Sequence, residues 1–230
     1  MPHWTYEGEE GPEHWGGLDG RFILCETGRS QSPIDILAPA SDNLSDIQFS
    51  YQPSVLTIKN NGHTVQVDYA AGSSITVAGK QYDLKQFHFH HPSEHSLAGV
   101  RYPMEVHFVH ADADGNLAVV GAMIQEGTED NAAFAPVFEN MPMQTADPQT
   151  MDNVMINAAD MLPAEHEYFG YSGSLTTPPC SEGVKWMLLT TPITLSVEQI
   201  EKFESVFELD ARPTQPLNGR DVTADSGADS

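Results

Sequence analysis

Apolar and polar residues alternate in short stretches along much of the chain between positions 47 and 190. This two-residue period predicts β-strands, because successive side chains of a strand point to opposite faces of a sheet. Several stretches carry β-branched residues, and turns that contain Gly or Asn separate them. The predicted strands are Ile47–Tyr51, Leu56–Asn60, Thr64–Tyr69, Ser74–Val77, Lys85–His91, Glu105–His110, Leu117–Gln125 and Val184–Thr190.

Patterns that predict helices are fewer. Thr128–Glu139 and Pro148–Met161 both follow cap-like residues. Ser196 and Gln199 have the spacing of a capping box, which predicts a helix from there to Val206. The chain is therefore expected to be mainly β, with a few peripheral helices.

The first 45 or so residues are rich in Gly, Pro and charge, with Trp4, Tyr6, Trp15 and Phe22 among them. They are expected to form an irregular arm whose aromatic side chains dock on the core. The sequence contains no internal repeat and no linker long enough to divide it, so we predict a single domain over residues 1–220. The small, acidic segment Asp221–Ser230 is expected to be a frayed tail.

One predicted strand contains the sequence Q-F-H-F-H-H. Its alternation puts His88 and His90 on one face, roughly 7 Å apart at the backbone, and Phe87 and Phe89 on the other. A neighbouring predicted strand offers His107. Two imidazoles from one strand and one from the next can occupy three corners of a tetrahedron and leave the fourth open, as in catalytic zinc sites. Histidines in strands are also often ordinary core residues with satisfied hydrogen bonds, and the pattern alone leaves both interpretations open.

Metal-bound histidines need an acceptor for their second ring nitrogen, which fixes the tautomer and the ring orientation. Gln86 lies on the predicted face of His88, and Glu105 on that of His107. Both are expected to support the metal ligands from behind, although either could be an ordinary polar strand residue. His91 falls on the opposite face and is expected not to bind the metal.

The chain carries 33 acidic and 10 basic residues, a formal net charge of −23. Such a surface repels nucleic acid and anionic membranes, which argues against both as partners. Adaptation to a saline medium, ordinary solubility and cation binding all fit this charge. We favour the first, halotolerance, because Lys and Arg are scarce and salt screens self-repulsion. No apolar run approaches the length of a membrane helix.

The two cysteines, Cys25 and Cys180, are 155 positions apart and lack a metal-binding spacing. Either both are free thiols or they form a disulfide, and a disulfide would imply an exported protein.

The histidine motif belongs to a longer series that spans nearly all of the chain. The series consists of Gly11–Trp15 (G-P-E-H-W), Gln31–Asp35 (Q-S-P-I-D), Asn60–His63 (N-N-G-H), Gln86–His90 (Q-F-H-F-H), Ser93–His95 (S-E-H), Glu105–His110 (E-V-H-F-V-H), Ser174–Cys180 (S-L-T-T-P-P-C) and Arg212–Leu217 (R-P-T-Q-P-L). In these motifs and their order the chain resembles the α-class carbonic anhydrases, and its short loops and cysteines resemble the bacterial members. The resemblance implies one domain with a large, twisted, mostly antiparallel central sheet and helices around it.

The same resemblance implies a zinc enzyme that reversibly hydrates carbon dioxide to bicarbonate and a proton, by attack of a zinc-bound hydroxide. Zn²⁺ would be held by His88, His90 and His107, although Co²⁺ could occupy the same ligands. Weak ester hydrolysis is the expected side activity. The family also implies sulfonamide or anion inhibitors, and its bacterial members suggest a possible homodimer.

Three catalytic residues follow from the resemblance. Thr176 would accept a hydrogen bond from the hydroxide and donate one to an ionised Glu94, although T-T-P-P is otherwise simply a turn. His63 would carry the proton out of the site, because a histidine titrates near neutral pH. The expected water network that leads to it comprises Tyr6, Asn61 and Gln66. The expected apolar pocket for the substrate comprises Val109, Val119, Leu175, Thr177, Val184 and Trp186.

Other matches to the family have structural implications. Cys25 and Cys180 match a disulfide of the bacterial members, which implies an exported, periplasmic or extracellular protein. His95 and His110 match hydrogen-bonding positions of the interior, and His166 is expected on the surface.

Two rival functions remain. A non-catalytic binding module is disfavoured because the three ligands, Glu94 and Thr176 are all present. A zinc hydrolase for larger substrates is disfavoured by the bulky apolar residues of the pocket.

Overall fold

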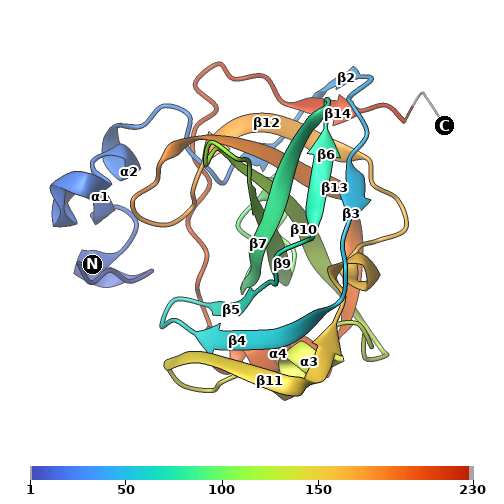
Figure 1. Ribbon diagram of the computed structural model, residues 1–230. Helices are drawn as coiled ribbons and strands as arrows, with labels where there is room; N and C mark the ends of the chain where they lie inside the picture. Colours follow the sequence, from blue (N-terminus) through green and yellow to red (C-terminus); the bar gives the residue numbers. More distant parts are fainter. Residues whose placement is uncertain (1, 228–230) are drawn as a thin grey trace.

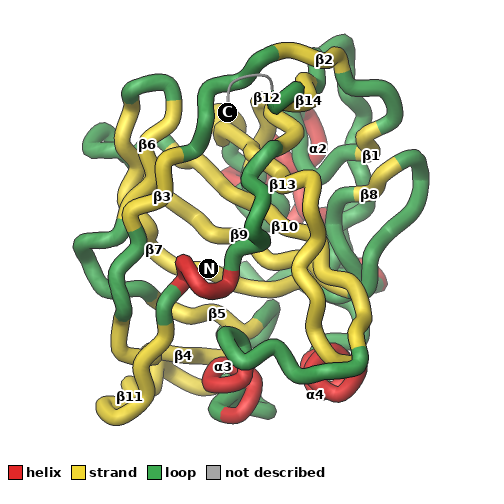
Figure 2. The backbone as a smooth tube through the Cα atoms, turned by 90° about the vertical axis from the view of Figure 1, so that its right-hand side faces the viewer, coloured by secondary structure: helices red, strands yellow, loops and turns green. Residues whose placement is uncertain are grey.

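The computed structural model describes residues 2–227. A mixed, twisted sheet crosses the molecule, with helices at its ends and sides (Figures 1 and 2). Its strands are β2 (Ala40–Asp42), β3 (Gln48–Ser50), β4 (Ser54–Asn60), β5 (Val65–Asp68), β6 (Ser74–Val77), β7 (Lys80–His90), β9 (Met104–Ala111), β10 (Leu117–Gly127), β11 (Ala146–Ile156), β12 (Tyr168–Ser174), β13 (Glu182–Ser196) and β14 (Thr223–Asp225).

The strand order is β11-β4-β5-β7-β9-β10-β13-β12-β14-β2, with β6 pairing β7 and β3 pairing β6. Most pairs are antiparallel, while β10–β13 and β14–β2 are parallel. A separate parallel pair joins β1 (Asp35–Ile36) to β8 (Ser96–Leu97). The predicted fold class is confirmed, including the mostly antiparallel central sheet.

The helices are short and peripheral. They are α1 (Trp15–Leu18), α2 (Leu24–Thr27), α3 (Ala135–Glu139) and α4 (Val197–Glu204), with 3₁₀ turns η1 (Gly8–Glu10), η2 (Gly20–Phe22) and η3 (Ala158–Met161). The capping box predicted at Ser196 is present at the start of α4. No helix among the described residues is long and apolar enough to cross a membrane.

The helix predicted over Pro148–Met161 is wrong. Residues Ala146–Ile156 form the edge strand β11, which pairs with β4, and only the last four residues of the prediction turn helically as η3. Of the helix predicted over Thr128–Glu139, only Ala135–Glu139 is helical. The C-terminal segment is also more ordered than predicted, because β14 pairs with β12 and β2; residues 228–230 lie outside the described chain.

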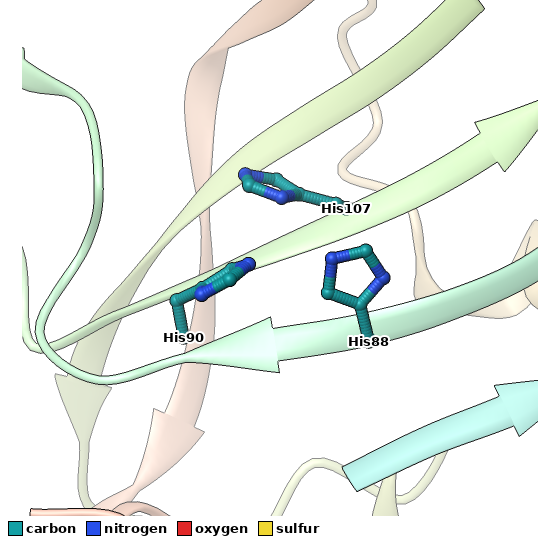
Figure 3. A group of neighbouring side chains, drawn as sticks. All are labelled: His88, His90 and His107. Atoms are coloured by element: carbon teal, nitrogen blue, oxygen red, sulfur yellow. The ribbon is translucent and has the colours of Figure 1, made fainter. Parts of the chain in front are cut away.

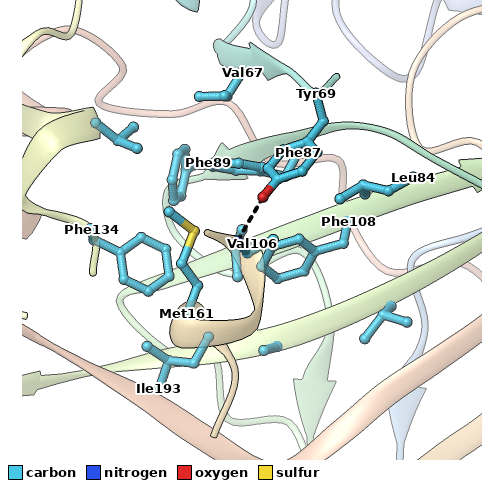
Figure 4. Packing of buried hydrophobic residues seen from close by; sticks show 14 of the residues in the cluster. Val67, Tyr69, Leu84, Phe87, Phe89, Val106, Phe108, Phe134, Met161 and Ile193 are labelled. Carbon is cyan, nitrogen blue, oxygen red and sulfur yellow. Dashed lines mark hydrogen bonds between the residues drawn. The ribbon is translucent and has the colours of Figure 1, made fainter. Parts of the chain in front are cut away.

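The two faces of β7 and β9 differ sharply in composition. One face contributes Phe87, Phe89 and Phe108 to the main hydrophobic core, where all three rings are essentially inaccessible to solvent (Figure 4). The opposite face carries the histidines His88 and His107. Alternation along the strands therefore separates the packed core from the polar site, as predicted.

The N-terminal arm folds as a small unit beside the sheet, where α1 and α2 lie (Figure 1). Its aromatic residues Trp4, Trp15 and Phe22 pack together with Cys25 and Cys180. These two cysteines form a disulfide, with their Cα atoms 5.0 Å apart. The arm is thereby attached covalently to the loop that follows β12.

Candidate metal centre

Three histidines converge on the polar face of the sheet (Figure 3). In the antiparallel register of β7 and β9, His88 lies directly opposite His107, and His90 is two residues further along β7. One nitrogen from each ring lies within 4.8 Å of the others. The strands therefore bring together the set of ligands that the sequence predicts.

Each ring has its other nitrogen held by an oxygen acceptor. Nδ1 of His88 donates to the side-chain carbonyl of Gln86 at 2.8 Å, and Nε2 of His107 donates to Glu105 at 2.7 Å. Nδ1 of His90 donates to the backbone carbonyl of Asp210 at 2.7 Å. An ionised carboxylate and a carbonyl oxygen can only accept, so the proton of each imidazole is on the anchored nitrogen. The facing nitrogens, Nε2, Nε2 and Nδ1, therefore present lone pairs.

The electrostatics of the site favour the neutral form of His88 and His107, whereas the pKa of His90 is raised, because burial, which lowers it, is outweighed by the nearby Glu94 and Asp210. Burial, followed by the charges of His90 and His107, holds the pKa of His88 well below its usual range, and burial also lowers the pKa of His107. Burial alone would raise the pKa of Glu105, but its contacts with His95 and His107 hold that pKa well below the usual range. Glu105 is thus an ionised acceptor behind a neutral ligand.

The facing atoms fit a bound cation. Nε2 of His90 is buried without a hydrogen-bond partner, 3.4 Å from Oε2 of Glu94, which also has none. Nδ1 of His107 lies 3.9 Å from the same oxygen. Lone pairs that face one another across a buried space repel, and a nearby cation removes that repulsion. Three imidazole nitrogens suit Zn²⁺.

Glu105 belongs to a buried hydrogen-bond network that could not be predicted from the sequence. Its Oε1 accepts from Nδ1 of His95 at 2.7 Å, and its Oε2 accepts from the His95 backbone N–H. Since Nδ1 of His95 is the donor, its Nε2 accepts from the Tyr171 hydroxyl at 2.7 Å. That hydroxyl lies 2.8 Å from Oγ of Ser32, which accepts from the backbone N–H of Ser174. His107, one of the three candidate ligands, is thus connected to the strand end that precedes Thr176.

A cavity of about 160 Å³ opens over the three histidines. The predicted pocket residues that line it are Val109, Val119, Leu175, Thr177 and Trp186. Val184 is not among the lining residues; it is buried in the hydrophobic cluster that also contains Val119 and Trp186. One side of the cavity is therefore an apolar wall of Val109, Val119, Leu175 and Trp186, beside the imidazoles and Thr176.

Glu94 is fully buried beside the ligands. Its Oε1 accepts from the backbone N–H of Arg212 at 2.9 Å, and its Oε2 is the unpartnered atom noted above. The structure gives no hydrogen bond between Glu94 and the hydroxyl of Thr176, which lines the cavity. The predicted relay therefore has its acceptor in position but is not formed.

The Arg212 side chain connects this region to the N-terminal arm. It donates to Oε1 of Gln31, to the carbonyl of Ser32 and to the carbonyl of Cys25. Its guanidinium also lies 5.6 Å from the ring of Trp15. The arm, the disulfide and the Glu94 carboxylate therefore contact one buried arginine, a role that could not be predicted from its sequence motif.

His63 lines the cavity and stacks on Trp4, with ring centroids 3.6 Å apart and planes within 5°. Partial burial, and then the neighbouring His3, lowers the pKa of His63. The other residues of the predicted water network also line the cavity. Among them, the Tyr6 hydroxyl is buried without a hydrogen-bond partner, and Asn61 accepts from the backbone N–H of His63.

The histidines outside the site are engaged elsewhere. His91 donates to the carbonyl of Glu208 and is not part of the ligand group. His110 lies on the apolar side of β9, where it contacts the Tyr51 hydroxyl at 2.8 Å. His166 packs against the ring of Phe49 and is only partly exposed.

Comparison with known proteins gives a consistent result. The sequence model of the eukaryotic-type carbonic anhydrases matches residues 10–226. The carbonic anhydrase of a Nostoc species is 46% identical over 223 residues, which cover 95% of this chain and 84% of the relative. Among solved structures, the α-carbonic anhydrase of Thermovibrio ammonificans in complex with the inhibitor sulfanilamide is 42% identical, with a TM-score of 0.93, covering 97% of this chain and 99% of that one. A hyperthermostable carbonic anhydrase from a hydrothermal vent chimney is 48% identical, with a TM-score of 0.93 and coverage of 96% and 99%.

Proposed function

Because the chain belongs to the α, or eukaryotic-type, carbonic anhydrases, whose reaction is the reversible hydration of carbon dioxide, we propose that it performs this reaction with Zn²⁺ held by His88, His90 and His107. The single observation that carries the zinc assignment is the arrangement of the three rings. Each has its proton committed to an acceptor and its lone pair directed toward the other two. Zn²⁺ at such a site acts as a Lewis acid and lowers the pKa of a bound water to about 7, as is established for carbonic anhydrases.

Glu94 and Thr176 orient the reacting water in this proposal. The free Oε2 of Glu94 is available to accept the hydroxyl proton of Thr176, because Oε1 is already occupied by the Arg212 N–H. A Thr176 hydroxyl that donates to Glu94 can only accept from the water, which fixes the direction of the water's remaining lone pair. Orientation of this kind lowers the entropic part of the barrier.

The apolar wall suits carbon dioxide, which has no net dipole. Val109, Val119, Leu175 and Trp186 line one side of the cavity, close to the imidazoles. A small apolar molecule gains by leaving water for such a surface. The 160 Å³ cavity has no space there for a large substrate beside the metal ligands.

His63 is the proposed proton carrier. It is a partly buried histidine at the cavity wall, outside the three proposed ligands, and its lowered pKa leaves it neutral and able to accept a proton at neutral pH. We expect His63→Ala to slow turnover about tenfold or more in weak buffer, with recovery when imidazole is added. His14→Ala, which removes an exposed histidine outside the cavity, is the control. Equal rates for wild type and His63→Ala in weak buffer would exclude the shuttle role.

The disulfide supports a further proposal, that the protein is exported. Recovery of the native protein mainly from the cytoplasmic fraction would contradict this.

The net charge of −23 supports the proposal of salt adaptation, for which we expect the melting temperature to rise with added NaCl. A melting temperature that stays flat or falls would count against it.

The decisive experiment combines metal analysis with stopped-flow hydration of carbon dioxide. We expect one Zn²⁺ per chain, loss of activity when a chelator removes it, and recovery with one equivalent of Zn²⁺. His88→Ala should neither retain the metal nor recover. Sulfanilamide should inhibit the zinc form, and slow zinc-dependent hydrolysis of 4-nitrophenyl acetate should accompany hydration. Full hydration activity in the zinc-free protein would overturn the metal assignment.

A further inference from the structure

A second groove lies along β12 and β13 and shares only Trp186 with the cavity over the three histidines. Its volume is about 280 Å³, and the aromatic residues Tyr168, Tyr171 and Trp186 are among those that line it. Lys185 is the one charged residue among the described residues that line this groove. The groove therefore combines an apolar surface with a single ammonium group.

Lys185 is partly buried and has no counter-ion among residues 2–227. Three of the other lysines, Lys59, Lys80 and Lys85, each pair with an aspartate. Burial and then the like charge of Lys80 lower the pKa of Lys185, so its surroundings do not compensate its charge. This is unexpected in a chain where acidic residues outnumber basic ones by 33 to 10.

The remaining lysine provides a direct contrast. Lys202 is also partly buried and also has no ion pair in the described chain, but the groove that it lines contains three carboxylates, from Asp130, Glu139 and Glu198. The groove of Lys185 contains none. The positive charge of Lys202 is thus balanced locally, whereas that of Lys185 is not.

A second cation lies beside the groove of Lys185. Nη1 of Arg220 donates to the carbonyl of Ser172, another lining residue, at 2.9 Å, and the guanidinium lies 5.7 Å from the ring of Tyr171. Ser172 and Thr223, which also line the groove, carry hydroxyl groups that can form hydrogen bonds. The charge of Arg220 is partly offset by Glu182, and Asp225 acts on Tyr168, so Lys185 is the cation at this groove whose charge is not compensated.

We propose that this groove binds a small organic carboxylate, with the carboxylate paired to the Lys185 ammonium and the apolar body against the aromatic residues. A volume of about 280 Å³ is just below the usual range for ligand pockets, about 300–1,000 Å³, and suits a molecule with one ring. One ammonium on a largely apolar surface suits a monoanion better than a phosphate, which usually needs several donors.

The ordinary alternative is that Lys185 only lays its aliphatic stem along the groove and keeps its ammonium in water. If this alternative is correct, the site of Lys185 should bind a carboxylate no more tightly than the site of Lys202. The two lysines therefore form a matched pair for the test.

The test is an NMR titration of the ¹⁵N-labelled zinc protein with benzoate, with sulfanilamide present to block the catalytic cavity. We expect saturable shifts of the amides of Gly170, Gly183 and Thr223. Lys185→Gln should weaken binding at least about tenfold, while Lys202→Gln should leave it unchanged and neutral benzamide should bind much more weakly than benzoate. The unchanged part of each variant's spectrum reports that it is folded.

Three results would overturn the proposal: no shifts at these amides, equal affinities for wild type and Lys185→Gln, or equal binding of benzoate and benzamide. Shifts confined to Thr176, Thr177 and Val119 would also overturn it, because they would report the catalytic cavity alone. If sulfanilamide itself failed to bind, the zinc proposal would be in question, but the amides of the groove would still report its occupancy.

Discussion

His107 and His110 lie three residues apart on β9 and face opposite sides of the same sheet. Both are buried. On the polar face, His107 uses one nitrogen to donate to Glu105 and leaves the other directed at His88 and His90. On the apolar face, both nitrogens of His110 are occupied, one by the Tyr51 hydroxyl and the other by the carbonyl of Ala118.

The difference between these two histidines distinguishes a proposed metal ligand from a core residue. Burial and residue type are shared, so neither identifies the metal site. What differs is whether a lone pair is left unused and what lies opposite it. The apolar face satisfies the polar atoms of His110 and packs rings around them, whereas on the polar face Nε2 of His90 and Oε2 of Glu94 are buried without a hydrogen-bond partner. The first arrangement stabilises the fold, and the second is available for chemistry.

The largest expected effect comes from Phe87→Ala. The ring of Phe87 is fully buried against Tyr69, Phe89 and Phe108, so truncation leaves a cavity in the main core. We expect the free energy of unfolding to fall by about 3–5 kcal/mol, measured by urea denaturation of the zinc-free protein. The zinc affinity and the hydration rate of the molecules that remain folded should change little.

His88→Ala, at the next position on β7, is the matched variant on the other face. It should abolish metal binding while changing the stability of the zinc-free protein by only about 1 kcal/mol. If Phe87→Ala impaired zinc binding as severely as His88→Ala, the two faces would not be separable in function.

The alternation that separates these faces could be predicted from the sequence because it is local. The ligands and the anchors Gln86 and Glu105 follow from residue spacing within two strands. The anchor of His90 could not be found in this way, because it is a backbone carbonyl 120 residues further along the chain, at Asp210. Any residue type offers such a carbonyl, so no side-chain pattern marks it.

The errors in the fold have a similar origin. β11 is mostly exposed on both faces and lacks alternation, so pairing with β4, distant in sequence, decides its conformation. β12 contains two glycines and is easily mistaken for a loop. Gly173 is required there because a Cβ at this position would overlap Oγ of Ser32. That contact again joins segments far apart in the sequence.

The buried His110 of the apolar face should make the free energy of unfolding depend on pH in the acid range. Burial lowers the pKa of His110 to about 4, whereas a histidine in the unfolded chain has a pKa of about 6.5. Between these values the unfolded state binds a proton that the native state excludes, so stability falls as the pH decreases from 6.5 to 4, by up to about 3 kcal/mol from this group. Above pH 6.5 His110 contributes no pH dependence.

The measurement is urea denaturation of the zinc-free protein at a series of pH values, which removes acid release of the metal from the comparison. His110→Gln should be less sensitive to acid over this range, whatever its stability at pH 7. Parallel pH profiles for the variant and the wild type would show that His110 has the same pKa in the folded and unfolded protein, which its buried position opposes.

The smallest effect, and the most specific test of the polar face, is expected for Glu105→Gln. Oε1 of Glu105 accepts from the rings of His107 and His95, and Oε2 accepts from the backbone N–H of His95. Gln keeps one acceptor but places an NH₂ group where the second oxygen was, next to a donor of His95. It also removes the negative charge behind His107. Such partners of metal-bound histidines generally account for about 10–100-fold in metal affinity, with carbonic anhydrases as the reference case.

We therefore expect Glu105→Gln to weaken Zn²⁺ binding by this factor, about 1.4–2.7 kcal/mol, in competition with a chelator of known affinity. Gln86→Glu is the informative counterpart, because it adds a charge behind His88, whose anchor is neutral. If the charge of the anchor controls the basicity of the ligand, the two substitutions should shift the affinity in opposite directions. If both weakened Zn²⁺ binding equally, the anchors would act through ring orientation alone, and the polar face would differ from the apolar face in geometry rather than in electrostatics.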